Sequence, residues 1–206
     1  MRAEDVMSSP VVTVRPDTPV KAAIGLMTSH GFTALPVVDA DDRLVGIVTE
    51  ADLVRDRVIP DARTLVWRED RAPVVEPPPD AVGEVMTSPA TAVRRSADIA
   101  EVATVMLDGH IRCTPVVDRG KLVGVVSRRD LLRTLARDDR AIVADVRHVL
   151  AKYGGHGRWA VSVADGVVTV VDEFDDAEDR HVASVLARSV PGVQAVTVTS
   201  RLDERV

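Results

Sequence analysis

Residues 35–53 read LPVVDADDRLVGIVTEADL, and residues 114–131 read TPVVDRGKLVGVVSRRDL. Each stretch places two valine-rich runs on either side of a short polar turn, which predicts two paired strands. Each then continues into a short polar segment with an acidic residue, as at the start of a helix. The chain therefore contains the same local structure twice.

The repeat also extends upstream of these strands. VMSSPVVTVRPD from Val6 recurs as VMTSPATAVRRS from Val85, an offset of about 79 residues. We expect a short strand over residues 11–14 and 90–93, followed by a helix in each copy. The order in each copy is then β, α, β, β, α. Because a unit of about 50 residues is marginal as an independent core, the two units are expected to pack on each other.

The expected start of each first helix has its own signal. In the first copy, Thr18 is the predicted N-cap and Pro19 the first helical residue. In the second copy, Ser96 is the predicted N-cap, with Asp98 in the first turn.

Composition excludes several classes of protein. The 206 residues are 46% hydrophobic and 28% charged, which indicates a folded chain, and the net charge of −6 argues against binding to nucleic acid. No apolar run approaches the length of a membrane span, and no leader pattern is present. The single cysteine, Cys113, has no partner for a disulfide or a zinc site. We therefore expect a cytoplasmic protein without a bound metal.

The repeated motifs resemble the CBS domain, the cystathionine β-synthase type of ligand-sensing module. The matching features are the VM(S/T)SP start, the PVVD strand, the LVG(I/V)V strand and the (S/T)xxDL end, present in both copies. The resemblance covers roughly residues 1–136 and implies a mixed α+β fold with two packed βαββα units. We assign residues 1–58 to the first unit and 82–138 to the second. Residues 59–81 form a Pro-rich linker, in which Trp67 either covers a core edge or anchors a neighbouring domain.

Two polar pairs stand at the predicted strand-to-helix junctions: Thr49 with Asp52, and Ser127 with Asp130. Exposed N–H groups at a helix start suit an anion such as phosphate. The same spacing is also that of a capping box, which needs no ligand. Spacing alone favours the capping box.

The CBS resemblance implies a ligand at these junctions. In this family the Ser or Thr typically approaches phosphate, and the Asp typically holds the ribose hydroxyls of an adenosyl ligand. Arg112 and Arg128 favour an anionic ligand in the second unit, whereas Glu50 would repel phosphate in the first. We therefore expect one good site and one weak or empty site, unless the paired units share clefts and redistribute these groups.

The resemblance also implies an apolar slot for adenine, although most of its residues would be core residues in a protein that binds nothing. The sequence does not decide which ligand binds among AMP, ADP, ATP, a nicotinamide dinucleotide, S-adenosylmethionine and a cyclic dinucleotide. His110 is a further candidate for contact with the ligand. The slot residues are Val12, Thr13, Phe32, Thr33, Leu35 and Pro36 in the first copy and Thr91, Ala92, Ile111, Cys113, Thr114 and Pro115 in the second.

Residues 139–206 follow a different pattern, α, β, β, α, β. A helix ends at Gly154 and Gly155, Asp165 and Gly166 form a hairpin turn, and a second helix starts near Asp176. Val182, Val185 and Leu186 are predicted to lie on one face of that second helix. A last strand is expected over residues 193–199.

The phrases VADGVVTV and VPGVQAV in this region are similar to the BON domain, a small bacterial module for which phospholipid binding is commonly proposed. Two departures matter. Asp172 stands where that family usually has a glycine, so the turn must differ or be strained. The acidic run DEFDDAED at 172–179 would be repelled by anionic lipid, and its simplest interpretation is a solvated face.

No sequence motif of an enzyme is present, so we nominate no catalytic residue and no required cofactor. The main hypothesis is a regulatory protein whose CBS pair binds an adenine nucleotide or related adenosyl ligand and transmits its state to the BON-like domain. The alternative is a non-catalytic dimeric scaffold whose BON-like domain binds a protein or a membrane phospholipid. A homodimer is expected in either case, because CBS pairs commonly associate.

Overall fold

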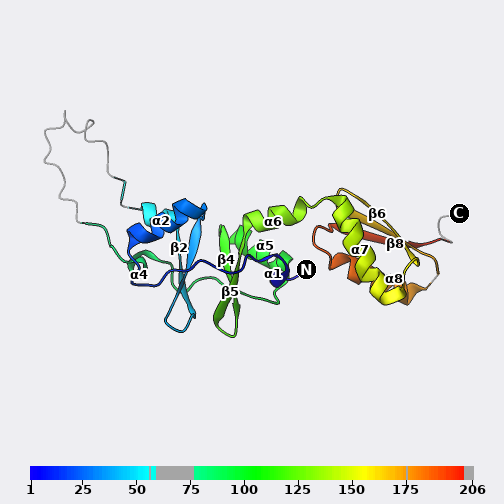
Figure 1. Ribbon diagram of the computed structural model, residues 1–206, viewed down its shortest axis with the longest axis horizontal. Helices are drawn as coiled ribbons and strands as arrows, with labels where there is room; N and C mark the ends of the chain where they lie inside the picture. The colour runs from blue at the N-terminus through cyan, green and yellow to red at the C-terminus, as the bar shows by residue number, and fades with distance from the viewer. Residues whose placement is uncertain (56, 59–76, 175, 202–206) are drawn as a thin grey trace, which may run out of the picture. The chain divides into compact units, whose positions relative to one another are not determined.

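The computed structural model describes residues 1–55, 57–58, 77–174 and 176–201 and has the predicted mixed α+β fold (Figure 1). The chain forms two compact units. One comprises Met1–Met7, Ser96–Thr104 and Ser127–Val206, and the other comprises Ser8–Arg95 and Val105–Val126. Among the described residues, no helix is both long and apolar enough to cross a membrane. Trp67 and most of the linker lie outside the described residues.

The first repeat contains α2 (Val20–His30), β1 (Ala34–Val38), β2 (Leu44–Thr49) and α3 (Glu50–Val54). The predicted valine-rich strands β1 and β2 pair antiparallel, with Pro36 opposite Ile47. Both strands are nearly continuous apolar runs, and β1 is buried at four of its five positions. Helix α2 buries Val20, Ala23 and Met27, which are three or four residues apart and therefore share one face. The core residues are Val14, Val20, Ala23, Met27, Leu35, Val37, Val48, Leu53 and Val82.

The second repeat contains β3 (Val93–Arg94), α5 (Ile99–Asp108), β4 (Cys113–Asp118), β5 (Lys121–Ser127) and α6 (Arg128–Leu135). Its sheet has the order β3-β4-β5, with β3 parallel to β4. Two single-turn helices that were not predicted, α1 (Ala3–Val6) and α4 (Val82–Val85), end at the valine that starts each VM motif. The predicted strand pairs and short closing helices of both repeats are confirmed.

The predicted first strand of each repeat is largely wrong. Within residues 11–14 only Val14 makes a bridge, parallel to Val37, and β3 is only two residues long. These segments carry the apolar composition of strands, but each contacts its neighbouring strand at one or two positions. Composition alone does not show how many of these contacts form.

The predicted helix caps also need correction. Thr18 is not the N-cap of α2, because Pro19 precedes the first helical residue and the Thr18 hydroxyl accepts from the Arg15 backbone N–H at 2.9 Å. In the second repeat the capping side chain is Asp98, not Ser96, since its Oδ1 accepts from the Ala100 N–H at 2.8 Å. Both helices start later than predicted.

The C-terminal region has the predicted order: α7 (Asp139–Gly154), β6 (Trp159–Ala164), β7 (Val167–Asp172), α8 (Ala177–Arg188) and β8 (Ala195–Ser200) (Figure 1). Strand β7 pairs antiparallel with β6 and parallel with β8. Asp165 and Gly166 both have left-handed φ angles, of 49° and 75°, as a tight hairpin turn requires. One face of the sheet packs on both helices. Its core residues include Ile142, Val146, Leu150, Trp159, Val161, Val168, Val170, Ala183 and Ala187.

Two expectations for this region are wrong. Val185 lies on the exposed side of α8, at 55% exposure, and the small residues Ala183 and Ala187 face the core instead. The acidic run is not simply a solvated face. Asp176 caps α8, and Asp172 is fully buried at the end of β7. The φ angle of Asp172 also lies outside the left-handed region. The turn after β7 therefore differs from the glycine-containing turn of BON domains, and its backbone is not strained at Asp172.

Candidate functional site

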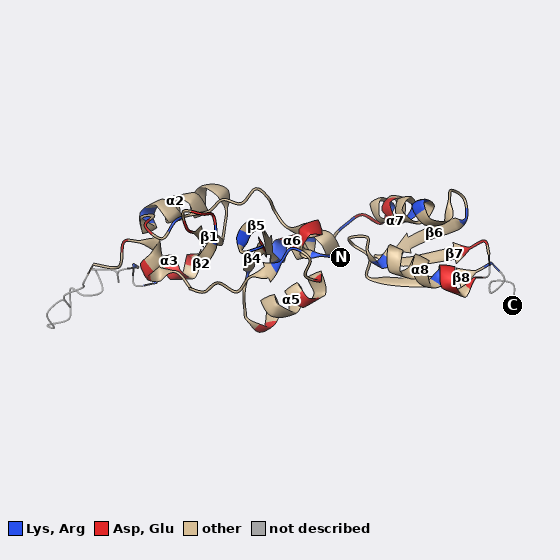
Figure 2. Ribbon diagram, turned by 90° about the horizontal axis from the view of Figure 1, so that it is seen from below, with Lys and Arg blue, Asp and Glu red and all other residues tan. Residues whose placement is uncertain are grey.

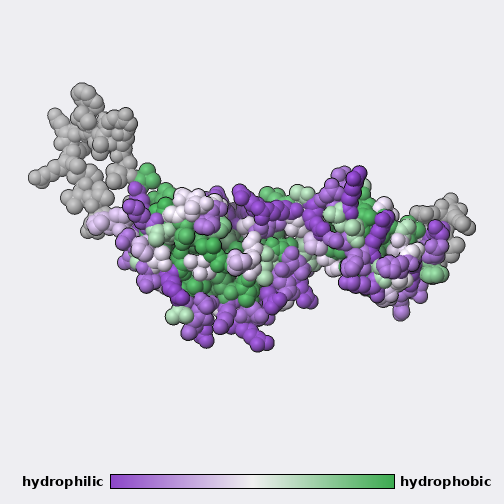
Figure 3. Space-filling model, in the orientation of Figure 1, coloured by the Kyte–Doolittle hydropathy of each residue, from purple (hydrophilic) through white to green (hydrophobic). Residues whose placement is uncertain are grey.

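A cavity of about 530 Å³ lies within the unit formed by Ser8–Arg95 and Val105–Val126. This volume falls in the range of small-molecule sites. Figure 3 shows apolar surface, in green, in the region of β2 and β4, two strands that contribute residues to the cavity. The lining residues are Thr33, Ala34, Ile47, Thr49, Glu50, Ala51, Thr87, Thr91, Gly109, His110, Ile111, Arg112 and Cys113.

The start of α3 forms one side of this cavity. The Thr49 backbone N–H and hydroxyl both donate to Oδ2 of Asp52, at 2.9 and 2.7 Å. The Thr49 hydroxyl in turn accepts from the Asp52 N–H at 3.4 Å, which completes a capping box. Within the described part of the chain, Asp52 Oδ1 accepts no hydrogen bond. The structural interpretation of this pair is therefore correct. Thr49 lines the cavity, whereas the predicted ligand-binding residue Asp52 does not.

A charged pair also lies on this cavity. Nη1 of Arg112 lies 2.5 Å from Oε1 of Glu50, the first residue of α3. Figure 2 shows acidic residues in red on α3. The expectation that Arg112 serves the second unit's junction needs correction, because this side chain pairs with the first unit's acid. The two residues are 62 positions apart, so their spacing carries no signal of the contact.

The second junction, at the start of α6, is also a capping box. The Ser127 N–H and hydroxyl donate to Oδ2 of Asp130, at 2.9 and 2.6 Å. The other oxygen, Oδ1, lies 3.2 Å from Nη1 of Arg133, and the Asp130 side chain is only 8% exposed. Both oxygens of Asp130 therefore have partners, unlike those of Asp52. The cavity described above is not lined by any of the three site residues predicted at this junction, Ser127, Arg128 and Asp130.

The predicted adenine slot is brought together only in part. Thr33, Thr91, Ile111 and Cys113 line the cavity, as does His110, whose φ of 52° is left-handed. The other slot residues do not line it: Val12, Thr13, Phe32, Leu35, Pro36, Ala92, Thr114 and Pro115.

Structural roles account for several of these absences. Pro36 pairs with Ile47 inside the first sheet, and Phe32 stacks on His30 at 5.0 Å between ring centroids. Thr114 is fully buried on β4. Sequence reasoning missed Ile47 and Thr87, which are joined by an isolated bridge. Nothing in the spacing of these two residues indicates that bridge.

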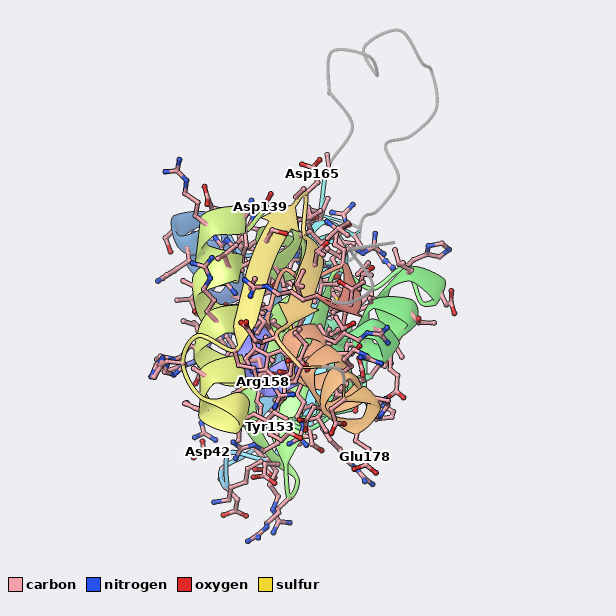
Figure 4. The ribbon with its side chains drawn as sticks, turned by 90° about the vertical axis from the view of Figure 1, so that its right-hand side faces the viewer. Asp42, Asp139, Tyr153, Arg158, Asp165 and Glu178 are labelled. Atoms are coloured by element: carbon pink, nitrogen blue, oxygen red, sulfur yellow. The ribbon has the colours of Figure 1, made fainter. Side chains whose placement is uncertain are left out.

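A second polar cluster lies in the C-terminal region, where Figure 4 shows Arg158 and Tyr153 near one another. Arg158 donates to both oxygens of Asp172 at 2.8 Å and contacts Asp179 at 2.6 Å. The Tyr153 hydroxyl donates to Asp179 at 2.6 Å. This bond raises the pKa of Tyr153 and, together with Arg158, lowers the pKa of Asp179. The hydrogen bonds to Asp172 and Asp179 raise the pKa of Arg158, and the four side chains form a connected structural network.

Comparison with known proteins identifies the repeats. A family model of the CBS domain matches residues 3–58 and 82–137. The chain belongs to the CBS domain family. The second match ends at residue 137, so the C-terminal region lies beyond the CBS family model.

Relatives of this CBS protein include Hypoxic response protein 1 of Mycobacterium tuberculosis. It is 30% identical over 71% of this chain and 92% of that protein. The chain is also 29% identical to inosine-5'-monophosphate dehydrogenase of Methanocaldococcus jannaschii, over 64% of this chain but only 23% of that enzyme. The match to the enzyme therefore spans less than a quarter of its length.

Two solved structures resemble the CBS pair and contain adenosyl compounds. CBSX2 in complex with AMP is 30% identical, with a TM-score of 0.53, over 64% of this chain and 93% of that one. The CBS domain pair of MJ0100, in complex with 5'-methylthioadenosine and S-adenosyl-L-methionine, is 25% identical, with a TM-score of 0.50, over 65% and 94%. CBS pairs similar to this one thus bind adenosyl ligands.

Proposed function

We propose that this protein is a non-catalytic regulator whose CBS pair binds an adenosyl ligand in the cavity beside α3. The single observation that carries the proposal is the cavity itself. It brings together Thr33, Thr49, Arg112 and Cys113, four residues expected to bind ligand. The adenosyl complexes of two similar CBS pairs support the same ligand class.

The cavity offers groups suited to each part of such a ligand. Ile47 and Ile111 supply apolar surface for a flat base, and the threonine hydroxyls supply hydrogen bonds. Asp52 is not a lining residue, but it follows the lining residue Ala51, and we assign its second carboxylate oxygen to a ribose hydroxyl. The proposed ligand-binding set now centres on the first unit's junction rather than the second's.

Ligand binding should be tested by thermal shift with a panel of adenosyl compounds, followed by calorimetry. A ligand that binds only the native state raises its stability by mass action. We expect Thr49→Val to weaken binding at least tenfold and the matched change at the second junction, Ser127→Ala, to change it less than threefold. Absence of binding by every compound, or equal effects of the two variants, would count against a site beside α3.

We further propose that the ligand state reaches the C-terminal region, which we interpret as a BON-like domain. The connection between α6 and α7 is short, and Arg137 within it donates to the Pro191 carbonyl at 2.7 Å and to Asp145 at 2.6 Å. A connection held in this way can transmit a small rotation of α6. The partner of the BON-like domain would be a protein or a phospholipid surface.

The alternative function is a dimeric scaffold that needs no ligand. Two observations favour it: both junctions are complete capping boxes, and Leu132 and Leu135 of α6 are about 60% exposed. Leu132 and Leu135 are three residues apart and share one face of α6, where a second subunit would bury them. Sedimentation of wild type and Leu132→Asp, each with and without ligand, separates the two hypotheses. The scaffold predicts a dimer that depends on Leu132 and is indifferent to every adenosyl compound.

A further inference from the structure

The charges on the cavity beside α3 constrain which adenosyl ligand fits. Glu50 and Arg112 are the only acidic residue and the only lysine or arginine among the described lining residues. They face each other at 2.5 Å, with side chains 48% and 68% exposed. Apart from His110, the lining therefore carries one negative group, Glu50, and one positive group, Arg112.

A phosphate would meet this pair unfavourably. A phosphate that binds Arg112 either displaces Glu50 or shares the guanidinium with it, and in both cases a carboxylate lies beside a doubly charged anion. Helix α3 offers little compensation, because it is five residues long and has Glu50 and Asp52 in its first turn. The Thr49 N–H and hydroxyl already donate to Asp52. The groups expected to bind phosphate at this junction are thus occupied or opposed.

A zwitterion would meet the same pair favourably. Its carboxylate can accept from the planar guanidinium of Arg112, and its cationic group can bind Glu50. Both charges of the protein then keep a partner of opposite sign, so no uncompensated charge remains. Because the existing pair is well exposed, it contributes little to stability, and exchanging it costs little.

We propose that Glu50 and Arg112 make this cavity selective for an adenosyl ligand that carries an amino-acid group over one that carries a phosphate. This inference rests on the proposed function and names the ligand class of the same site. The ligand carboxylate pairs with Arg112, and the ligand ammonium or sulfonium pairs with Glu50. Glu50 is the residue that sets the selectivity.

Calorimetry on the full chain with four compounds tests the proposal. S-adenosylmethionine and S-adenosylhomocysteine carry the amino-acid group, AMP carries phosphate, and 5'-methylthioadenosine carries neither. We expect both amino-acid compounds to bind the wild type at least tenfold more tightly than AMP. In Glu50→Gln this ratio should fall at least fivefold, while 5'-methylthioadenosine stays within twofold of wild type. In Arg112→Gln the amino-acid compounds and AMP should all weaken.

Matched controls are Glu101→Gln and Arg95→Gln, exposed charges that do not line the cavity, which should leave all four affinities unchanged. Tighter binding of AMP than of the amino-acid compounds would overturn the inference and leave the proposed function intact. So would an unchanged ratio in Glu50→Gln. Failure of all four compounds to bind the folded wild type would overturn the proposed function and the inference together.

Discussion

Gly46 of β2 occupies a position where a side chain does not fit. A Cβ there would lie 2.6 Å from the Met86 sulfur and 2.9 Å from the Thr87 carbonyl oxygen. The Ile47 N–H and carbonyl both bond to Thr87, so the two backbones cannot move apart without losing hydrogen bonds. This close approach explains the glycine of the LVGIV strand in the first repeat.

Gly46→Ala should therefore destabilise the protein by about 1–3 kcal/mol, the range found for overpacking. The matched control is Gly25→Ala, in the exposed part of α2 with no other atom within 4 Å of the added Cβ. That change should stabilise the protein by about 1 kcal/mol, because alanine favours helix over glycine. Chemical denaturation measures both. Equal effects of the two substitutions would contradict the packing argument.

Tyr153 is the only tyrosine of the chain, so its ionisation can be followed directly by tyrosinate absorbance. Its hydrogen bond to Asp179 raises its pKa above the usual 10.0. We expect Asp179→Asn to move the titration midpoint down toward 10.0, and the neighbouring Glu178→Gln to leave it in place. A wild-type midpoint at or below 10.0 would show that the bond does not form in solution.

The same bond predicts how stability changes with pH. Asp179 has a lowered pKa in the folded state, so its contribution is present above the unfolded value near 3.8 and is lost as pH falls through the folded value. Tyr153 has a raised pKa, so its contribution is present below 10.0 and is lost as pH rises through the folded value. Tyr153→Phe should flatten stability at the alkaline end. An unchanged alkaline transition in this variant would contradict the claim that the bond between Tyr153 and Asp179 contributes to stability.

At the scale of elements, a buried ion pair joins β7 to the start of β6. Asp172 is fully buried, Arg158 is 14% exposed, and two bonds of 2.8 Å connect them. Arg158 also lies over the rings of Trp159 and Phe174, at 4.4 and 5.2 Å from their centroids. The pair thus fixes the end of the hairpin opposite to the Asp165 turn (Figure 4).

Asp172→Ala should cost about 3–5 kcal/mol, because it leaves a guanidinium largely buried with only Asp179 as partner. The matched control is Glu173→Ala, which removes the exposed pair between Glu173 and Arg201 and should cost less than about 1 kcal/mol. Urea unfolding of both variants in the Trp67→Phe background, followed by the fluorescence of Trp159, measures both losses. Similar losses in the two variants would show that Asp172 is accessible to water in solution.

At the scale of the whole molecule, the question is whether ligand binding to the CBS pair changes the stability of the C-terminal region. Trp159 lies in the core of that region, and Trp67→Phe would leave it as the only tryptophan. We expect the best-binding adenosyl compound to raise the unfolding midpoint reported by Trp159. Arg137→Gln, which removes the bonds to Pro191 and Asp145, should abolish that rise while ligand affinity stays within twofold.

The control is the same experiment with Arg201→Gln, an exposed arginine of the same region that does not join it to α6. If the ligand binds but does not change the unfolding midpoint reported by Trp159, the CBS pair and the C-terminal region do not communicate. That result would support the scaffold hypothesis. A rise that persists in Arg137→Gln would place the communication elsewhere.

The sequence by itself determined the repeated units, the strand pairs, both capping boxes and the αββαβ order of the C-terminal region. These features depend on residues a few positions apart, whose side-chain periods and turn preferences act locally. The tertiary structure alone decided the partner of Arg112, the bridge between Ile47 and Thr87, and the burial of Asp172. Each depends on residues distant in the chain or on how completely a side chain is enclosed, and local patterns carry no information on either. The cavity therefore depends on packing between distant residues, whereas the motifs beside it could be predicted from the repeat.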